Sequence, residues 1–285
     1  MEPELIADYA CVIGEGPLWH PQERRLYWID IARGHIYRYQ PASGVHEQVY
    51  EGDSVGGFTI QADGALLLFM ERGAVKTWRD GALTTLIEEI PAERDSRFND
   101  VIADPVGRVF CGTIATADHQ GRLYRLDPDC SLTEVQGDVG TSNGLGFTPD
   151  RTRMYYTDSP KYEIYLFDYD VASGSISNRR VFARLAESEG LPDGLTVDAD
   201  GYVWSARWDG ECVVRYAPDG REERRVSMPV KIASSITFGG DDYADLYITS
   251  GGGDRKHEKG AAAGGLFRVR PGVRGVPEFF SRIGL

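Results

Sequence analysis

The sequence predicts an all-β protein, a six-bladed β-propeller with a metal site in its central channel, and we expect residues 1–285 to form a single domain of this kind. Three observations predict the propeller. One motif recurs six times, its copies lie 40 to 49 residues apart, and each copy is followed by a second strand-like stretch that ends in a turn. A chain of 285 residues is also within the length that closed all-β architectures occupy as one unit.

The repeated motif joins a polar residue, an alternating apolar stretch, a turn rich in Asp, Gly and Pro, and a short β-prone run. The six copies begin at Gly14, Gly56, Phe98, Ser142, Pro192 and Ser234. The first apolar residues of their second strands are Leu26, Leu66, Val109, Met154, Val203 and Leu246, at intervals of 40, 43, 45, 49 and 43 residues. Such intervals fit blades of four strands, whereas a β-sandwich gives no reason for six matching copies.

The second half of each repeat has the two-residue period of an outer strand pair and ends in a Gly, Pro or Asp turn. These halves begin at His35, Ala74, Arg122, Glu163, Val213 and Leu266. No amphipathic segment of helix length is present, although residues 85–94 could form a short helical turn. We expect the segment GGGDRKHEKG, which starts at Gly251, to be a flexible loop between strands of the last blade.

The innermost strand of each propeller blade lines the channel, so residues at equivalent positions of the repeat form a ring. At the start of these strands the ring consists of Glu15, Gly56, Asn99, Asn143, Asp193 and Ser235. Carboxylate and amide oxygens that converge without sulfur or imidazole suit Ca²⁺, Mg²⁺ or Mn²⁺. A divalent cation would balance Glu15 and Asp193, with Asn143 as a neutral oxygen donor. The alternative, for each residue taken alone, is a hydrogen bond to backbone at a blade entrance.

The second strands run back toward the same mouth of the channel, so their last residues form an outer ring. This ring consists of Asp30, Glu71, Thr113, Asp158, Arg207 and Ser250. Asp158 is a candidate for orienting a metal ligand, and strand capping or pairing between blades is the alternative. The polar loop ATADHQG that follows Thr113 is long enough to overhang the mouth, which makes Asp118 and His119 weaker candidates for ligand contact.

Arg97, in the stretch SRFND, lies two residues before Asn99 at the predicted mouth. Its guanidinium would present a rigid fork of donors to the hydroxyl or carbonyl oxygens of a polar ligand. The alternative is a surface ion pair with Asp95 or Asp100.

Composition argues against several classes of function. The formal net charge of −13 argues against a nucleic-acid partner, since phosphate binding depends on clustered Lys and Arg. No run approaches the roughly 18 apolar residues that span a bilayer, and residues 1–10 are acidic where a signal peptide would be basic. We therefore expect no membrane partner and a cytoplasmic location. The four cysteines lack CxxC spacing, and the motifs HExxH and GxxxxGK(S/T) are absent from the sequence.

A series of short motifs spans the chain from residue 14 to about residue 250. They read GEGPLWH, RFND, GT after the third blade's second strand, SNGL with YYTDS, PDGLTVD with GYVW, and FGG with LYIT. In order and spacing they resemble the family of SMP-30 (regucalcin), gluconolactonases and luciferin-regenerating-enzyme-like proteins. The resemblance implies one divalent ion bound by Glu15, Asn143 and Asp193, and a substrate contacted by Arg97 and Asn99. Regucalcin-like members have a substrate-contacting glutamate in the loop after GT, and this loop has none, so we expect a different sugar preference.

The resemblance implies an enzyme that hydrolyses a small-molecule sugar lactone, of the gluconolactone type, to the aldonic acid. Asp193 is the candidate general base, while Arg97 and Asn99 would hold sugar hydroxyls. We expect Ca²⁺ as the ion, with Zn²⁺, Mn²⁺ or Mg²⁺ as alternatives, and a monomer or weak homo-oligomer. Two other functions stay open: a calcium-binding or divalent-metal-binding regulatory protein of the regucalcin type with little turnover, and an interaction platform like WD-repeat propellers.

Overall fold

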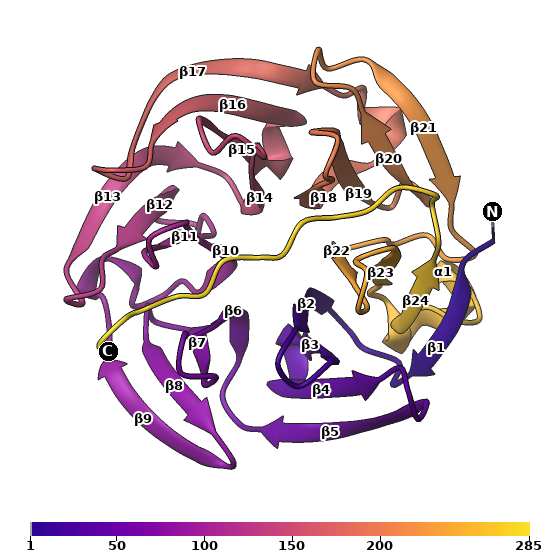
Figure 1. Cartoon of the computed structure of the whole chain (residues 1–285), viewed down its shortest axis with the longest axis horizontal. Helices are drawn as coiled ribbons and strands as arrows, with labels where there is room; N and C mark the ends of the chain where they lie inside the picture. Colours follow the sequence, from indigo (N-terminus) through magenta and orange to yellow (C-terminus); the bar gives the residue numbers. More distant parts are fainter. Residues whose placement is uncertain (1) are drawn as a thin grey trace.

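Six four-stranded antiparallel sheets are arranged radially around a central channel in the computed structural model, which describes residues 2–285 (Figure 1). The predicted six-bladed β-propeller is confirmed. Because each blade runs from the channel outward and the next begins again at the channel, the innermost strands β2, β6, β10, β14, β18 and β22 surround the axis.

Each blade has four strands in order from the channel to the rim. The first three blades consist of β2 (Gly14–His20), β3 (Arg25–Asp30), β4 (His35–Gln40) and β5 (Val45–Glu51); β6 (Val55–Ile60), β7 (Leu66–Met70), β8 (Val75–Arg79) and β9 (Ala82–Ile87); and β10 (Phe98–Ala103), β11 (Val109–Thr113), β12 (Gly121–Leu126) and β13 (Leu132–Val139). The last three consist of β14 (Ser142–Phe147), β15 (Arg153–Asp158), β16 (Glu163–Asp170) and β17 (Ser175–Arg184); β18 (Leu191–Val197), β19 (Val203–Trp208), β20 (Cys212–Tyr216) and β21 (Glu222–Ser227); and β22 (Ile236–Gly239), β23 (Asp245–Thr249), β24 (Gly265–Val269) and β1 (Glu4–Asp8).

The sixth blade takes its outermost strand from the beginning of the chain. Strand β1 pairs antiparallel with β24, with Glu4 opposite Arg268, and their side chains form an ion pair at 2.6 Å. A second ion pair at 2.7 Å joins Asp8 to Lys256. The ring is thus closed by pairing between segments from opposite ends of the sequence, which the repeat pattern did not predict.

Short helical turns occupy the connections, namely η1 (Ile31–Arg33), η2 (Pro91–Glu93), η3 (Ser159–Lys161), η4 (Glu187–Glu189), η5 (Gly253–Arg255) and α1 (Lys256–Lys259). The helical turn predicted over residues 85–94 is wrong in extent, because β9 continues to Ile87 and only Pro91–Glu93 is helical. The segment after Gly251 does connect β23 to β24, but it forms η5 and α1 instead of an irregular loop.

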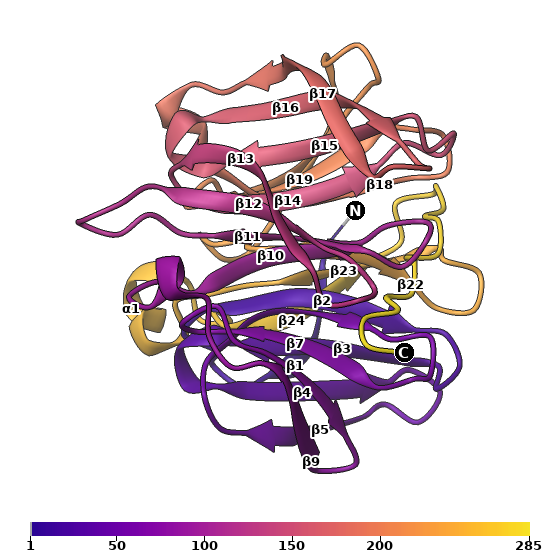
Figure 2. The same cartoon turned by 90° about the vertical axis from the view of Figure 1, so that its left-hand side faces the viewer.

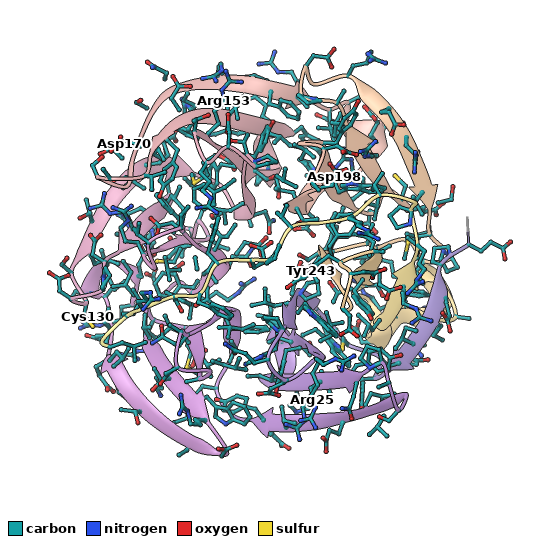
Figure 3. All side chains as sticks on the ribbon, in the orientation of Figure 1. Arg25, Cys130, Arg153, Asp170, Asp198 and Tyr243 are labelled. Atoms are coloured by element: carbon teal, nitrogen blue, oxygen red, sulfur yellow. The ribbon has the colours of Figure 1, made fainter. Side chains whose placement is uncertain are left out.

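Apolar side chains fill the spaces between neighbouring blades (Figure 3). There are six clusters, one for each pair of adjacent blades. Trp204 of blade five meets Phe238 of blade six edge to face at 6.0 Å, and Phe69 of blade two meets Phe98 of blade three at 5.3 Å. Apolar burial therefore holds the blades to one another and leaves the strand ends at the channel mouth free for polar residues.

The segment after β24 crosses the channel on the face opposite α1 (Figures 1 and 2). The N–H of Ala199 donates to the carbonyl of Arg274 at 2.8 Å, the N–H of Ser281 donates to the carbonyl of Ile60 at 2.9 Å, and Gly284 reaches Pro128 at 2.8 Å. This C-terminal strap, residues 270–285, ties blades two, three and five together and covers one end of the channel. Within residues 2–285, no helix is long and apolar enough to cross a membrane.

Candidate active site

The other end of the channel holds a cavity of about 180 Å³ at the start of the innermost strands. It is lined by all five residues that the sequence predicted for the site, Glu15, Arg97, Asn99, Asn143 and Asp193. Two other ring positions are not part of its lining. Ser235 faces the channel below it, and Gly56 packs against the backbone of Phe98, where a Cβ would lie 1.9 Å from the carbonyl oxygen.

The strands that carry these residues are irregular where the site lies. The pairing of β2 with β3 shifts after Glu15, that of β14 with β15 shifts after Asn143, and that of β18 with β19 shifts across Asp193. Each shift is a β-bulge, which changes the direction in which a side chain points. Glycine follows each of the three residues; Gly16 adopts a left-handed φ of 53°, and a Cβ at Gly144 would lie 2.7 Å from the carbonyl of Asp193.

A chain of hydrogen bonds orients the polar side chains across three blades. Arg97 Nη1 donates to Asn99 Oδ1 at 2.6 Å, and Asn99 Nδ2 donates to Asn143 Oδ1 at 2.7 Å. Asn143 Nδ2 donates to Ser159 Oγ at 2.7 Å, and that hydroxyl donates to the carbonyl of Pro192 at 2.6 Å. Because the Ser159 proton is used by Pro192, the amide nitrogen of Asn143 must face Ser159 and its oxygen must face Asn99.

Two buried carboxylates in the site have no cationic partner. Glu15 and Asp193 are 3% and 4% exposed, and within residues 2–285 neither forms an ion pair with Lys, Arg or His. Burial, and then repulsion from Asp193 and Asp100, raises the pKa of Glu15 well above its usual value; burial, and then repulsion from Asp100, does the same to the pKa of Asp193. The Arg97 charge opposes both shifts. Unpaired carboxylates in such a place are costly unless a cation joins them.

The residues fit a hard divalent cation. Glu15 accepts one hydrogen bond, at 2.9 Å from the N–H of Gly16, which leaves carboxylate lone pairs free, and Asn143 adds an amide oxygen. Two carboxylates and an amide without sulfur suit Ca²⁺, Mg²⁺ or Mn²⁺. Among the residues described by the structure, no group of three or more His, Cys, Asp or Glu gathers as metal ligands, and the candidate set consists of two carboxylates and the neutral oxygen of Asn143.

The remaining candidates lie outside the cavity. Asp95 pairs with His119 at 3.0 Å, whereas Arg97 donates to the Phe98 carbonyl at 2.9 Å and to Asn99, so the predicted alternative of an Arg97 pair with Asp95 is wrong. Neither His119 nor Asp118 lines the cavity. His119 bonds Asp95 instead, and the loop that holds it contributes no residue to the cavity lining.

Several lining residues were missed in the sequence. These are Ile13, Thr141, Ser159, Pro160, Leu191 and Trp208. Three of them had a detectable signal, because Ile13, Thr141 and Leu191 each lie two residues before a ring residue, as Arg97 does. Alternate residues of an extended segment point to one side, so the position two residues upstream shares the cavity. Ser159 and Trp208 had no such signal.

The fold and the site thus define a six-bladed propeller whose channel mouth gathers buried carboxylate and amide oxygens beside an arginine. The chain belongs to the SMP-30/gluconolactonase/LRE-like family, whose model matches residues 13–252.

Named relatives agree with this assignment. The pentonolactonase XacC of Haloferax volcanii is 46% identical over 98% of both chains, and regucalcin of Gallus gallus is 34% identical over 94% of both. A solved structure of a luciferin-regenerating enzyme superimposes with a TM-score of 0.89 at 27% identity, covering 99% of this chain and 100% of the other.

Proposed function

We propose that this protein is a sugar lactonase that opens the ring of an aldonolactone to the aldonic acid and depends on one divalent cation. The observation that carries the proposal is the convergence of Glu15, Asn143 and Asp193 with Arg97 around one cavity of about 180 Å³. The 46% identical relative is a pentonolactonase, which supports a lactone of a small sugar as the substrate. A gluconolactone-type lactone needs the same chemistry.

A cation held by Glu15, Asn143 and Asp193 would supply Lewis-acid polarisation of the lactone carbonyl and lower the pKa of a bound water. Asp193 is the proposed general base: its carboxylate accepts a proton from the attacking water and later delivers it to the ring oxygen. Acid and base duty of this kind contributes about 10²- to 10⁴-fold to a rate. The buried position of Asp193 keeps bulk water from competing for that proton.

Arg97 and Asn99 are the proposed substrate-binding residues. Among the hydrogen bonds of residues 2–285, Arg97 uses only Nη1, with Asn99 and the Phe98 carbonyl, so its other guanidinium N–H groups are available to sugar hydroxyls. Asn99 has a second lone pair on Oδ1 and also holds Arg97 in place. The flat ring of Trp208 offers an apolar wall to the carbon face of the sugar.

The alternative is a metal-binding regulatory protein of the regucalcin type with little turnover, and the regucalcin of Gallus gallus is a relative at 34% identity. The lactonase proposal is preferred because the proposed ion would lie beside an arginine and a sugar-sized cavity, which a simple cation binder does not need.

Further features complete the proposal. Ca²⁺ is the proposed ion, with Zn²⁺, Mn²⁺ and Mg²⁺ as alternatives, and the protein is proposed to act as a monomer or weak homo-oligomer without nucleic acid or membrane. Residues 1–285 are proposed to act as one domain. A cytoplasmic location is proposed because its reducing environment suits the four cysteines, all of which are free thiols.

The test is hydrolysis of a panel of pentonolactones and hexonolactones, followed with a pH indicator. Metal-stripped protein is compared with the same protein after each divalent ion is restored. Turnover that depends on the ion supports the lactonase, and the panel ranks the sugars. Tight Ca²⁺ binding without turnover on any lactone would instead favour the regulatory function.

A further inference from the structure

Blades one and four hold Glu15 and Asn143 with the same side-chain arrangement, whose key residues are Asp30 and Asp158. Asp30 ends β3 and Asp158 ends β15, and the two side chains are 0% and 1% exposed. Neither carboxylate lines the cavity of the candidate active site. A buried carboxylate needs hydrogen-bond partners, and the identity of those partners indicates its role.

In blade one, the Asp30 carboxylate accepts two backbone hydrogen bonds. The N–H of Val12 donates to Oδ2 at 3.0 Å and the N–H of Ile13 donates to Oδ1 at 3.1 Å. These donors lie three and two residues before Glu15. The N–H of Ile31 donates to the carbonyl of Ile13 at 2.9 Å. Both the N–H and the carbonyl of Ile13, two residues before Glu15, are therefore hydrogen-bonded to this end of β3.

Blade four repeats the arrangement at the same sequence offsets. Asp158 Oδ1 accepts from the N–H of Gly140 at 3.1 Å and from the N–H of Thr141 at 3.3 Å. These donors lie three and two residues before Asn143. The N–H of Ser159 donates to the carbonyl of Thr141 at 3.3 Å, as Ile31 does in blade one.

Each carboxylate also has a basic partner three residues further on. Arg33 Nη1 lies 3.5 Å from Asp30 Oδ2, and Lys161 Nζ lies 3.1 Å from Asp158 Oδ2. These residues end the turns η1 and η3. The positive charge offsets part of the cost of burying the carboxylate, so both blades keep a charged acceptor at this position.

Blade five shows why the other two blades need a carboxylate. Strand β18 already begins at Leu191, which pairs with Trp208, so strand pairing itself holds the residues just before Asp193. In blades one and four, the pairing between the first two strands begins only one residue before the site residue, at Gly14 and at Ser142. At the position equivalent to Asp30 and Asp158 in the strand register, blade five has Arg207, which donates to Ser205 and to the Ala206 carbonyl instead.

We propose that Asp30 and Asp158 are positioning residues, which fix the backbone before Glu15 and Asn143 and thereby set the affinity of the site for a divalent cation. The inference rests on the proposed function, because it takes Glu15 and Asn143 as ligands. In both blades, the carboxylate accepts backbone hydrogen bonds just beyond the point where the strand pairing ends. Without the carboxylates, two partly buried N–H groups in each blade lose their acceptors, and the backbone that carries the ligand side chain is no longer fixed.

The experiment measures the Kd for Ca²⁺ by titration calorimetry on the metal-stripped full chain. We compare wild type with Asp30→Ala, Asp158→Ala and the milder Asp30→Asn and Asp158→Asn, after checking each fold by circular dichroism. Removal of a partner that orients a ligand typically weakens metal binding about 10- to 100-fold, and we expect this for the alanine variants, with smaller losses for asparagine.

A matched control is Asp198→Ala at the opposite end of blade five. Asp198 is 0% exposed, accepts backbone hydrogen bonds from Asp200 at 3.0 Å and Tyr202 at 2.9 Å, and pairs with Arg215 at 2.7 Å (Figure 3). Asp198 therefore resembles Asp30 and Asp158 in its burial and in accepting backbone hydrogen bonds, but it lies away from the proposed metal ligands. Folded Asp198→Ala keeps the wild-type Kd if the inference is correct, and an equal loss of affinity in this control would overturn it.

Amide hydrogen exchange of the wild type gives a second measurement that does not depend on how well a variant folds. We expect the amides of Val12, Ile13, Gly140 and Thr141 to be protected without Ca²⁺ and to exchange still more slowly with it. Exchange as fast as in exposed loops would overturn the inference. Folded alanine variants with the wild-type Kd would overturn it while leaving the proposed function intact, whereas failure of the wild type to bind Ca²⁺, Mn²⁺, Mg²⁺ or Zn²⁺ would contradict both.

Discussion

The side-chain amide of Asn99 donates a hydrogen bond to Oδ1 of Asn143 across 2.7 Å, which joins blade three to blade four at the mouth of the channel. The other end of Asn99 accepts from Arg97 at 2.6 Å. One lone pair of the Asn143 oxygen is thus used, and the second remains for a cation. The proposed substrate-binding residues and one proposed metal ligand, Asn143, are therefore parts of one network.

Asn99→Ala removes the link between the two halves of this network. Arg97 and Asn143 both lose a hydrogen bond, so we expect kcat/KM to fall at least about 10²-fold, because small displacements of positioned groups have effects of that size. Steady-state kinetics on the best lactone measures the loss. Asn178→Ala is the matched control, since Asn178 lies exposed on β17, and it keeps the wild-type kcat/KM. Equal rates for Asn99→Ala and wild type would contradict the role of the network.

Ser159→Ala removes the hydroxyl that links Asn143 to the Pro192 carbonyl. The amide nitrogen of Asn143 loses its acceptor and the Pro192 carbonyl loses its donor, both in a buried place. We expect a loss of about 1–3 kcal/mol in the free energy of unfolding, as for other unsatisfied buried polar groups. Denaturant titration measures it. The exposed Ser43→Ala, which removes only surface contacts, is the control and changes stability by less than about 0.5 kcal/mol.

Arg97→Lys separates the geometry of the guanidinium donors from their positive charge. Lysine keeps the positive charge near Glu15 and Asp193 but lacks the planar fork, so we expect weaker sugar binding with the metal affinity preserved. The expected result is a KM about 10-fold higher or more, with a smaller change in kcat, corresponding to about 1.4 kcal/mol of lost binding. Unchanged KM for every lactone would show that Arg97 does not hold the substrate.

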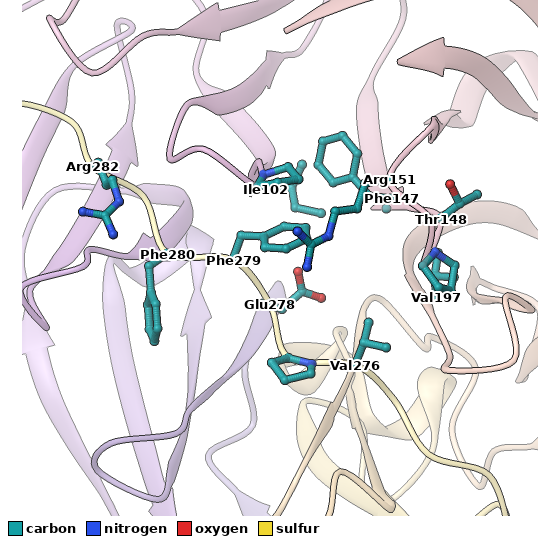
Figure 4. A pocket seen from close by; sticks show the side chains of 14 residues that line it. Ile102, Phe147, Thr148, Arg151, Val197, Val276, Glu278, Phe279, Phe280 and Arg282 are labelled. Carbon is teal, nitrogen blue, oxygen red and sulfur yellow. The ribbon is translucent and has the colours of Figure 1, made fainter. Parts of the chain in front are cut away.

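We expect Glu278 on the C-terminal strap to make the free energy of unfolding depend on pH. It lines a cavity of about 420 Å³ on the face opposite the site, together with Arg151, whose guanidinium lies 5.2 Å from the ring of Phe279, and with Arg282 (Figure 4). Burial raises the pKa of Glu278 from 4.5 to about 7. Between these values the folded protein holds a proton that the unfolded chain has released, so stability falls as pH rises through this window.

Glu278→Gln removes this loss. At about pH 8 we expect the variant to be more stable than wild type by about 1–3 kcal/mol, while at about pH 4 the two have the same free energy of unfolding. Thermal unfolding across the pH range measures the difference. The exposed Glu258→Gln is the control and shows no such dependence. A Glu278→Gln variant that is less stable at about pH 8 would mean that the carboxylate is paired there.

The repeat explains why much of the site was predictable. Once six copies are aligned, symmetry alone places Glu15, Asn99, Asn143 and Asp193 at one mouth, because equivalent positions of a propeller share a radius and a height. The two-residue period of a strand likewise places Arg97 beside Asn99.

Other features arise from contacts that no repeat encodes. Strand β1 belongs to no copy of the motif, and its partner β24 lies more than two hundred residues away in sequence. Ser159 was missed because its role comes from the Pro192 carbonyl of the next blade. His119 was misplaced because its ring bonds Asp95, a neighbour that exists only after folding. Tertiary contacts, not local propensity, decide such positions.

The most direct test of the proposed metal-dependent lactonase is the initial rate of aldonolactone opening by metal-stripped protein as Ca²⁺ is added, for wild type and for Asp193→Ala. We expect a rate that rises from the buffer value and saturates for wild type, and a rate that stays at the buffer value for the variant. Stripped wild type as active as the restored protein, or a fully active Asp193→Ala, would contradict it.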